Sequence, residues 1–325
     1  MENEIFDSRL DLSGLSEAVS RIRLEVGKVI VGQDQMVDLL LTALLADGHV
    51  LIEGVPGVAK TLTSKVLARI LNVDFSRIQF TPDLMPSDIL GTSVFNMKEG
   101  TFSYRKGPVF TNILLIDEIN RSPAKTQAAL FEVMEERQVT ADGETLPFQE
   151  PFMVVATQNP IEQEGTYRLP EAQLDRFLFK IEVGYPDVDD EVSILKKFHT
   201  DTTGVKLDTL SKVLSGEEIV KYRQITREIH VSDEVFKYIA SLVSDTRGHH
   251  DLYLGASPRA SLAILAGAKA YAAISGRDFV TPEDVQFIAA PVLRHRLILT
   301  PEKEMEGDSV DKIIGRIIDK LEVPR

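Results

Sequence analysis

The stretch from Leu51 to Thr61, which reads LIEGVPGVAKT, constrains the fold of this chain more than any other. A short apolar run over His49–Ile52 predicts a buried strand, and Lys60–Leu71 predicts a helix with one apolar face. The two elements are joined by a tight turn that contains glycine and proline. A strand, a glycine-bearing loop and a helix in this order are the setting in which a phosphate-binding loop is built.

The turn carries the groups that a phosphate needs. It leads into a helix N-terminus, where unpaired backbone N–H groups and the helix dipole attract an anion. Gly54 and Gly57 allow the backbone to fold around the phosphate, because glycine has no Cβ that would clash. Lys60 can reach the β- and γ-phosphates as a point charge, and Thr61 offers a hydroxyl to Mg²⁺. The predicted nucleotide contacts in this stretch are Gly54, Val55, Pro56, Gly57, Val58, Ala59, Lys60, Thr61 and Leu62.

Two residues of the turn need a separate explanation. Lys60 lies in the first helical turn, where a cation opposes the helix dipole by roughly 0.3–1 kcal/mol, a cost that a bound anion would offset. The common phosphate-loop pattern, G-x-x-x-x-G-K-[ST], has glycine where this chain has Ala59. We expect Ala59 to adopt the helical conformation, which alanine tolerates. The alternative for the whole stretch is an ordinary strand–turn–helix with a surface lysine.

Composition narrows the remaining functions. The chain has 325 residues, enough for two domains, and 43% of them are hydrophobic, enough for a packed core. A formal charge of −14 without a long basic run argues against a general nucleic-acid-binding surface. The lack of cysteine excludes disulfides, thiolate metal sites and cysteine catalysis. The acidic N-terminus lacks a signal-peptide pattern and no apolar run approaches a membrane span, so we expect a soluble cytoplasmic protein without membrane insertion.

Further strands are predicted beyond the first one. Strands that alternate with helical segments form a layered α/β domain with a mainly parallel sheet, and ligands of such sheets bind at the carboxyl ends of the strands. With the strand before the turn, the sheet would have five strands. The additional candidates are Arg77–Thr81, Asn112–Asp117, Phe152–Thr157 and Phe177–Val183.

Two acids follow a strand that is apolar on both faces, Ile113–Ile116, as a central parallel strand should be. Asp117 fits the carboxylate that holds the hydration shell of Mg²⁺ next to a phosphate loop. Glu118 can orient or deprotonate the attacking water. The alternative is that both acids merely cap the next helix at its positive end.

Other polar residues are placed to complete the site. Asn159 follows the Phe152–Thr157 strand and is a candidate to hold the attacking water or the γ-phosphate, although Asn-Pro alone is only a turn signal. Val31 and Gly32 lie in a segment where many nucleotide-binding modules seat the base, and a plain helix–helix turn explains them equally well.

Two segments read as hairpins that the sheet does not need. Residues 94–104 would turn at Glu99-Gly100, and residues 138–146 would turn at Asp142-Gly143. Each hairpin could project toward a protein client or a neighbouring subunit. The alternative is that both are ordinary surface hairpins.

The chain divides near Gly184–Glu191. We predict an N-terminal tail over residues 1–15, a nucleotide-binding domain over 16–186 and an all-helical lid over 187–325. The tail is followed by a helix over Ser16–Ile30 and by a second helix from about Asp34 to Leu45. The lid helices are expected at about 189–199, 216–230, 232–246, 258–275, 282–293 and 308–321, with cap-plus-proline starts at two of them.

Arginines and histidines at four places carry further predictions. Arg259 lies in the first turn of a helix, where an acid would be more stable, and a γ-phosphate across the domain cleft would explain it. The alternative is a surface arginine paired with a nearby acid. Arg176 has no convincing local partner except Asp175 or Glu171. His249-His250 and His295-Arg296 are expected at the surface without a metal, because no ligand partners lie at suitable spacing.

Taken together, these segments resemble the AAA+ ATPases of the MoxR type over roughly residues 16–300. The motifs that carry the resemblance are GVPGVAKT at 54–61, IDEINR at 116–121, ATQNP at 156–160, LDRF at 174–177 and SPRA at 257–260. The resemblance implies a P-loop NTPase fold, with Walker A and Walker B motifs. It also implies sensor 1 at Asn159, an arginine finger at Arg176 and sensor 2 at Arg259.

The same resemblance implies a working assembly. Similar proteins form a homo-oligomeric ring, usually a hexamer, with a helix-2 insert and a pre-sensor-1 insert at the two predicted hairpins. They hydrolyse ATP with Mg²⁺ and act as chaperone-like factors on protein clients, often loading metals or cofactors into partners with a von Willebrand factor A domain. In this interpretation Thr61 and Asp117 hold the metal, and the catalytic residues are Glu118, Lys60, Asn159, Arg176 and Arg259. Arg121 is a weaker candidate for the subunit interface.

Two other functions remain to be separated from this one. A DNA-directed motor or loader shares the phosphate chemistry, but the charge of −14 and the lack of basic–aromatic clusters count against stable nucleic-acid binding. A nucleotide-gated scaffold would bind ATP without turnover, and Glu118 argues against it.

Overall fold

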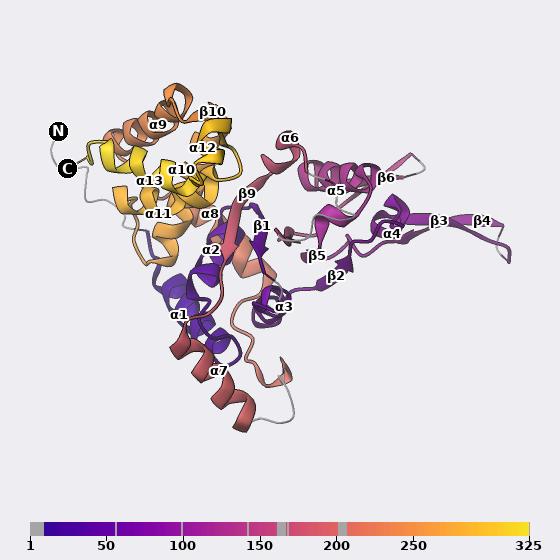
Figure 1. The fold of residues 1–325 in the computed structure, drawn as a ribbon. Helices are drawn as coiled ribbons and strands as arrows, with labels where there is room; N and C mark the ends of the chain where they lie inside the picture. The colour runs from indigo at the N-terminus through magenta and orange to yellow at the C-terminus, as the bar shows by residue number, and fades with distance from the viewer. Residues whose placement is uncertain are drawn as a thin grey trace, which may run out of the picture.

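The computed structural model describes residues 10–55, 57–98, 100–141, 143–160, 167, 169–200 and 207–324. Pro56 of the predicted loop lies outside the described residues, as do the expected turn residues Glu99 and Asp142 and residues 1–9 of the predicted tail. Figure 1 shows an α/β part, a helical part beside it and two hairpins that project away from both.

The central sheet has five strands in the order β2-β5-β8-β1-β9, and every neighbouring pair is parallel. All five strands overlap the predicted segments, which confirms the predicted sheet. The strand β5 is apolar on both faces and lies inside the sheet, as expected. The strands are β1 (His49–Gly54), β2 (Phe75–Gln79), β5 (Ile113–Asp117), β8 (Met153–Gln158) and β9 (Phe177–Val183).

Successive strand residues enter two separate hydrophobic cores, because side chains alternate between the faces of a sheet. In β5, Ile113 and Leu115 belong to one core, and Leu114 and Ile116 belong to the other. The strand β8 alternates in the same way. A parallel sheet buried on both faces by helices is the predicted three-layer architecture.

Helices cover both faces of this sheet. One core contains residues of α1 (Ser13–Gly27), α2 (Asp34–Leu45) and α3 (Lys60–Ile70), and the other contains residues of α4 (Pro86–Leu90) and α5 (Ala124–Glu136). The helix α2 has the predicted bounds. The helix α1 begins and ends three residues before the predicted Ser16–Ile30. The reason is that Leu12 and Leu15 are buried, so the hydrophobic core already begins within the predicted tail.

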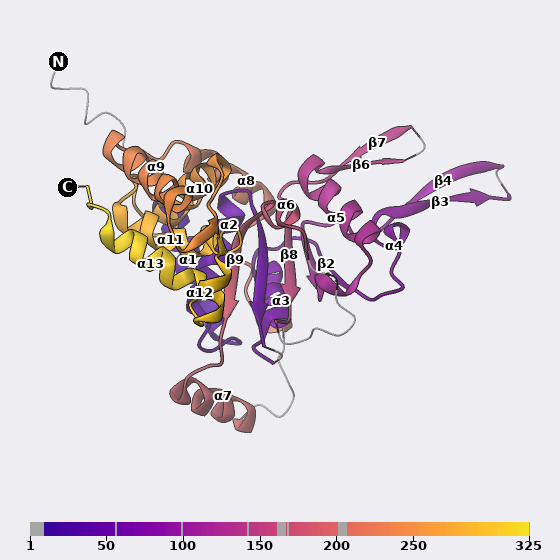
Figure 2. The ribbon, with the colours of Figure 1, turned by 45° about the horizontal axis from the view of Figure 1, so that its top comes forward.

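The two predicted hairpins are confirmed, with slightly wider bounds. The first consists of β3 (Gly91–Asn96) and β4 (Thr101–Lys106), and the second of β6 (Gln138–Ala141) and β7 (Glu144–Pro147). Figures 1 and 2 show that both project from the same side of the α/β part, away from the helical part. Neither pairs with the central sheet.

The C-terminal part is helical except for one short strand pair. In it β10 (Leu252–Leu254) pairs antiparallel with β11 (Ile298–Leu299), so the expectation of an all-helical lid is wrong in this detail. The two strands are too short for their alternation to be recognised in a sequence. The helices are α7 (Val188–Thr200), α8 (Gly216–Arg227), α9 (Asp233–Gly248), α10 (Pro258–Ile274), α11 (Pro282–Leu293), α12 (Pro301–Met305) and α13 (Val310–Lys320). Nowhere in the described ranges is there a helix both long and apolar enough to cross a bilayer.

The helical part does not pack as a separate lobe. A single hydrophobic core contains residues of α1, α2, β1 and β9 together with residues of α8, α9, α10, α11 and α13. The α8 residue Arg223 is buried and donates through Nε to the Leu44 carbonyl at 2.8 Å. It also pairs with Asp47, which in turn pairs with Arg137 of the α5 end. The predicted domain boundary at 186/187 falls between β9 and α7 and stays a prediction.

His49, the first residue of β1, is a buried imidazole that ties two elements together. Its Nδ1 accepts the backbone N–H of Val154 in β8 at 3.0 Å, and its Nε2 donates to the Met134 carbonyl of α5 at 3.1 Å. Burial lowers the pKa of His49 to about 4, and the nearby Arg137 adds to this effect. A second proton on Nδ1 would face the Val154 N–H, so the folded protein needs the neutral ring.

We predict that the stability of the protein falls as the pH drops from 6.5 toward 4, the ordinary and the folded-state pKa of His49. The unfolded chain takes up this proton near its ordinary pKa, whereas the folded chain takes it up only near pH 4. The contribution of neutral His49 to the free energy of unfolding is therefore complete above the ordinary pKa. Lowering the pH to about 4 removes about 3 kcal/mol of it. Urea unfolding of wild type and His49→Gln between pH 7.5 and 4.5 measures the effect. The variant should show a smaller pH dependence, and equal slopes would refute the assignment.

Candidate functional site

The predicted phosphate loop joins the end of β1 to the start of α3. Gly54 ends β1, and a Cβ there would lie 2.5 Å from the Val183 carbonyl oxygen of the neighbouring strand β9. Gly57 has a φ of +92° with open space around it, a conformation that favours glycine. One glycine is thus required by a close neighbour and the other by its backbone conformation.

Ala59 differs from the expectation. It has φ 57° and ψ 19°, the left-handed conformation, and it caps α3 instead of lying in its first turn. The expectation of a helical Ala59 is therefore wrong, and the glycine of the common pattern suits this position because it adopts the left-handed region freely. An alanine held there stores roughly 1–2 kcal/mol of strain.

Lys60 begins α3 and folds back over the loop. Its Nζ donates to the Gly54 carbonyl at 2.5 Å and lies 3.4 Å from the Gln158 carbonyl at the end of β8. Partial burial lowers the pKa of Lys60, while the carboxylates of Asp117 and Glu118 act in the opposite direction. The ammonium therefore spans the carboxyl ends of two strands, which is where a phosphate chain beside the loop would need a cation.

Asp117 ends β5 as a buried carboxylate surrounded by donors. Its Oδ1 accepts from the hydroxyls of Thr61 and Thr157, each at 3.2 Å, and its Oδ2 lies 2.6 Å from Nε of Arg77. A hydroxyl and a carboxylate in contact are hard oxygen donors of the kind that Mg²⁺ prefers in phosphate sites. The residues present therefore fit the predicted metal, with Thr61 and Asp117 as the groups that would hold it.

Glu118 has an unusual backbone conformation for its residue type, with φ 59° and ψ 52°. Its N–H donates to the Thr157 hydroxyl at 3.1 Å. Its Oε2 accepts from the Gln79 side chain at 2.7 Å and lies 3.1 Å from Nε of Arg121. A strained backbone held by several partners is typical of functional positions. Arg121, which we considered for a subunit interface, lies here against the acid of its own chain.

Sequence reasoning missed Arg77 and Gln79, both in β2. They stand two residues apart on an edge strand and therefore share one face, opposite Leu115 and Asp117 of β5. Two long polar side chains at alternating positions beside the acid-bearing strand were a signal that could have identified them.

The remaining predicted contacts lie near the same sheet edge. Asn159 is buried and follows the last residue of β8, which is the strand between Asp117 and the phosphate loop. Gly32 lines a cavity of about 440 Å³ together with Met36, the end of β9 and Arg294. Val31 precedes Gly32 in the turn before α2.

Arg176 lies where the strands begin, at the end of the sheet opposite to the phosphate loop. It immediately precedes β9, and β9 runs parallel to β1 with Phe177 beside His49 and Val183 beside Gly54. A strand of this length separates its two ends by roughly 20 Å, so Arg176 does not face the phosphate loop of its own chain. It contacts the Phe131 carbonyl at 2.9 Å and Glu135 at 3.1 Å. The expected partners Asp175 and Glu171 are replaced by these groups of α5.

Arg259 also lies at this far edge, in the first turn of α10. Its Nη1 is 3.7 Å from Oδ2 of Asp175, and its side chain is mostly exposed. The expectation that Arg259 points across the cleft at its own γ-phosphate is therefore not met. The lid packs so that α10 begins beside the residue before Arg176, which places both arginines at one edge.

His295 and Arg296 are buried, so the expectation that they lie at the surface is wrong. Arg296 follows α11 and pairs through Nε with Asp175 at 2.7 Å. Its other nitrogens donate to carbonyls that include Phe177 at 2.8 Å. Burial lowers the pKa of His295 well below its ordinary value. The contacts of Arg296 with Asp175 and Phe177 join the lid to the residues on either side of Arg176.

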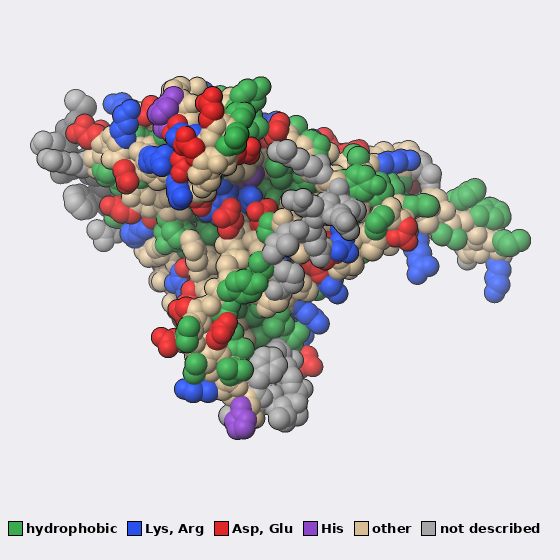
Figure 3. All heavy atoms as spheres, in the orientation of Figure 1, with side chains coloured by type: hydrophobic (Ala, Val, Ile, Leu, Met, Phe, Trp, Pro, Cys, Tyr) green, Lys and Arg blue, Asp and Glu red, His purple; other side chains and the backbone are tan. Residues whose placement is uncertain are grey.

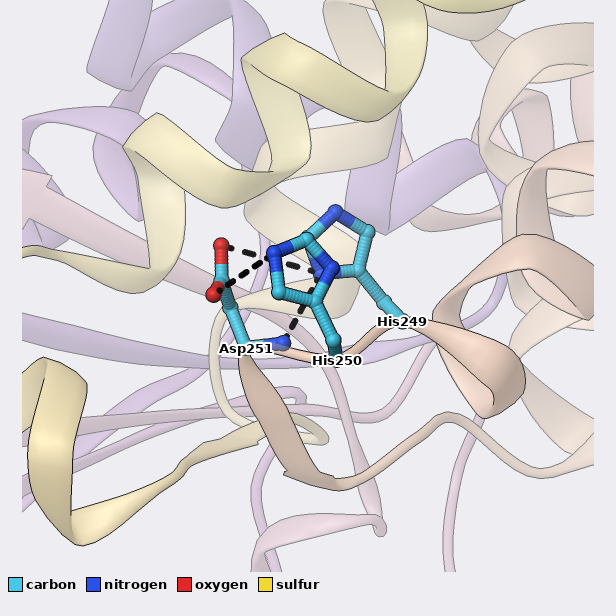
Figure 4. Close-up of side chains that lie close together, drawn as sticks. All are labelled: His249, His250 and Asp251. Atoms are coloured by element: carbon cyan, nitrogen blue, oxygen red, sulfur yellow. Dashed lines mark hydrogen bonds and ion pairs between the residues drawn. The ribbon is translucent and has the colours of Figure 1, made fainter.

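His249 and His250 have an acidic partner that the sequence analysis did not foresee. Figure 4 shows the two rings stacked beside Asp251, with His250 Nε2 at 3.2 Å from its carboxylate. Asp251 is buried and also lies 3.6 Å from Arg316 and 3.8 Å from Lys303. These two cations already compensate its charge and would repel a metal ion, so the cluster does not favour a metal site.

Comparison with known proteins matches two parts of the chain to family models. Residues 49–179 match the model described as "ATPase family associated with various cellular activities (AAA)", and residues 244–317 match the "AAA lid domain". The first match begins at β1 and ends in β9, so it contains the phosphate loop, both acids and Asn159.

Similar proteins cover nearly the whole chain. The chain is 46% identical to "Uncharacterized protein YeaC" of Bacillus subtilis, over 92% of each chain. It is also 46% identical to "Chaperone MoxR1" of Mycobacterium tuberculosis, over 94% of this chain and 82% of that protein. A crystal structure of a candidate ATPase from Cytophaga hutchinsonii has a TM-score of 0.88 at 43% identity, covering 96% of this chain and 97% of the other.

The left-handed Ala59 generates a stability prediction. Ala59→Gly should raise the free energy of unfolding by about 0.5–1 kcal/mol, because relief of strain exceeds the extra entropy that glycine gives the unfolded chain. Urea unfolding without nucleotide measures it. Ala260→Gly, in the first turn of α10, is the matched control and should be destabilising. A destabilised Ala59→Gly protein would contradict the assigned conformation.

Proposed function

The chain belongs to the AAA+ ATPases of the MoxR type, and from this premise we propose that it uses Mg²⁺ and ATP to remodel a protein partner. The observation that carries the proposal is the contact of Thr61 with Asp117 at 3.2 Å, because it joins the phosphate loop to the acid-bearing strand. Glu118, the next residue, lies where a water that attacks the γ-phosphate could be activated.

In this proposal each polar residue of the edge has one task. Thr61 and Asp117 hold Mg²⁺, which when bound neutralises charge on the phosphates. Lys60 binds the β- and γ-phosphates, and Asn159 orients the γ-phosphate or the water. Glu118 accepts the proton of that water. The loop contacts are Gly54, Val55, Pro56, Gly57, Val58, Ala59 and Leu62, with the base in the cavity beside Val31 and Gly32.

We propose that Arg176 and Arg259 act on the site of a neighbouring subunit. Both lie at the edge of the sheet opposite to their own phosphate loop. A ring in which this edge faces the loop of the next copy would bring both guanidinium groups to a γ-phosphate, where an arginine supplied in trans stabilises the transition state. The expected ring is a hexamer.

We propose that the first hairpin contacts the client. Phe102 and Met97 are 73% and 90% exposed, and Phe95 packs on Phe102 with ring centroids 5.0 Å apart. Figure 3 shows this hydrophobic surface at the end of the projecting hairpin, far from the lid. The work on the client would be assembly or the loading of a metal or cofactor, and a protein with a von Willebrand factor A domain is the expected type of partner.

The base assignment has a direct test. Glu118→Gln should bind ATP, seen by titration calorimetry with Mg²⁺, while its hydrolysis rate falls by roughly 10²-fold or more. The carboxamide keeps the size of the side chain but cannot take a proton. Glu302→Gln, on the exposed surface of α12, is the matched control and should hydrolyse ATP normally.

The same variant tests the work on a client. With ATP bound and not hydrolysed, Glu118→Gln should retain a protein partner in a pull-down, and Phe102→Ser in that background should release it. If Glu118→Gln hydrolyses ATP as fast as wild type, Glu118 is not the base that accepts the proton of the water. A folded chain that shows no heat with ATP and Mg²⁺ would remove the whole proposal.

The trans arrangement has a separate test. Arg176→Ala alone should lose about 10³-fold or more in hydrolysis rate. Coexpressed with Glu118→Gln, it should regain activity, because mixed rings contain sites with an intact Glu118 from one subunit and an intact Arg176 from the next. Arg316→Ala, in the exposed part of α13, is the control and should remain active alone. Mixed rings no faster than their parents would contradict the proposal.

A further inference from the structure

The carboxylate of Asp117 already has a cationic partner in this structure. Arg77 reaches it from β2, with its Nε 2.6 Å from Oδ2. The contact is charge-assisted and short, which places it among the stronger side-chain hydrogen bonds. The other oxygen, Oδ1, accepts from Thr61 and Thr157. Both oxygens of the predicted metal ligand are therefore engaged.

The two partners of this ion pair differ in burial. The Asp117 side chain is only 8% exposed, whereas the Arg77 side chain is 51% exposed. A buried carboxylate without a cation is costly, so a partner for Asp117 stabilises the protein. Arg77 supplies that partner, and its open surroundings leave the guanidinium room to move away without itself becoming a buried charge.

Arg77 is also connected to the second acid. Its Nη2 donates to Gln79 Oε1 at 3.2 Å, and Gln79 Nε2 donates to Glu118 Oε2 at 2.7 Å. Arg77 and Gln79 share one face of β2 because they are two residues apart. The four side chains thus form one row that runs from Asp117 through Arg77 and Gln79 to Glu118.

We propose that Arg77 is the counter-ion of Asp117 in the metal-free protein and gives up this carboxylate when a divalent cation binds there. A guanidinium within a few ångströms of a divalent cation is repelled by it. Arg77 therefore sets the concentration of divalent cation at which the site fills. When Arg77 moves away, its hydrogen bond to Gln79 is also lost. The Gln79 amide, which donates to Glu118, is then less firmly held. This inference rests on the proposed nucleotide site and adds a positioning residue to it.

The experiment measures metal binding instead of hydrolysis. Wild type and Arg77→Gln are saturated with a non-hydrolysable ATP analogue and titrated with Mn²⁺, whose free concentration is read by electron paramagnetic resonance. The dissociation constant for Mn²⁺ should fall by roughly tenfold or more in the variant, the size expected for the loss of one hydrogen bond to a charged group. Without ligand, the variant should also melt at a lower temperature, because Asp117 then lacks its guanidinium partner.

A charge-matched control separates this effect from net charge. Arg69 pairs with the exposed Asp208 on the outer side of α3, and Arg69→Gln should leave Mn²⁺ binding unchanged. If Arg77→Gln does not fold, Arg77→Lys is used, because a lysine keeps the charge but lacks the planar, forked donors with which Arg77 contacts Asp117 and Gln79. It should raise Mn²⁺ affinity by a smaller factor.

The outcomes are distinct. Tighter Mn²⁺ binding in the Arg77 variant but not in Arg69→Gln supports the proposal. Unchanged or weaker binding in a folded Arg77 variant overturns it, because Arg77 would then not compete with the metal. If the analogue does not bind to wild type at all, the proposed nucleotide site fails, and that result is separate from the role of Arg77.

Discussion

The site depends on one contact, the meeting of Thr61 with Asp117 at the carboxyl edge of the sheet. Thr61 arrives on the helix after the phosphate loop, and Asp117 arrives at the end of a strand two positions away in the sheet. Thr157, from the strand between them, donates to the same carboxylate and also accepts the Glu118 N–H. Three chain segments therefore converge on a single buried acid. Any change in strand order or register would separate these groups.

The second constraint is the way the lid packs. Arg223 pairs with Asp47, which precedes β1, and Arg296 pairs with Asp175, which precedes β9. These buried pairs join the lid to the opposite edge of the sheet from the phosphate loop. They place Arg259 beside Asp175, next to Arg176, and so two arginines that sequence motifs assign to catalysis lie together at an outward-facing edge. In the mechanism that we propose, both arginines act on the site of a second copy of the chain.

Much of the fold could be read from local patterns. The strands β1, β5 and β8 contain apolar runs, and α2 has an apolar face over its whole length, so their positions follow from hydrophobic burial. The features that were missed have little local signal. The strands β10 and β11 are too short to show a period, and α1 begins before its predicted start because Leu12 and Leu15 find partners far along the chain. His295 and Arg296 look like surface residues until α11 packs on β9.

The amino-acid sequence alone established the nature of the chemistry, because the phosphate loop, the two acids and Asn159 are recognisable as residue types at fixed spacing along the chain. Their meeting at one edge followed from the parallel order of the strands. Which partner each side chain contacts depended on contacts between distant segments. Arg77 lies beside Asp117, and Arg259 lies beside Asp175 instead of its own phosphate loop, and both contacts result from packing that brings together residues far apart in the chain. Local sequence patterns reflect only the preferences of residues that are neighbours in the chain. The contacts between distant residues form only when the whole chain packs into its core.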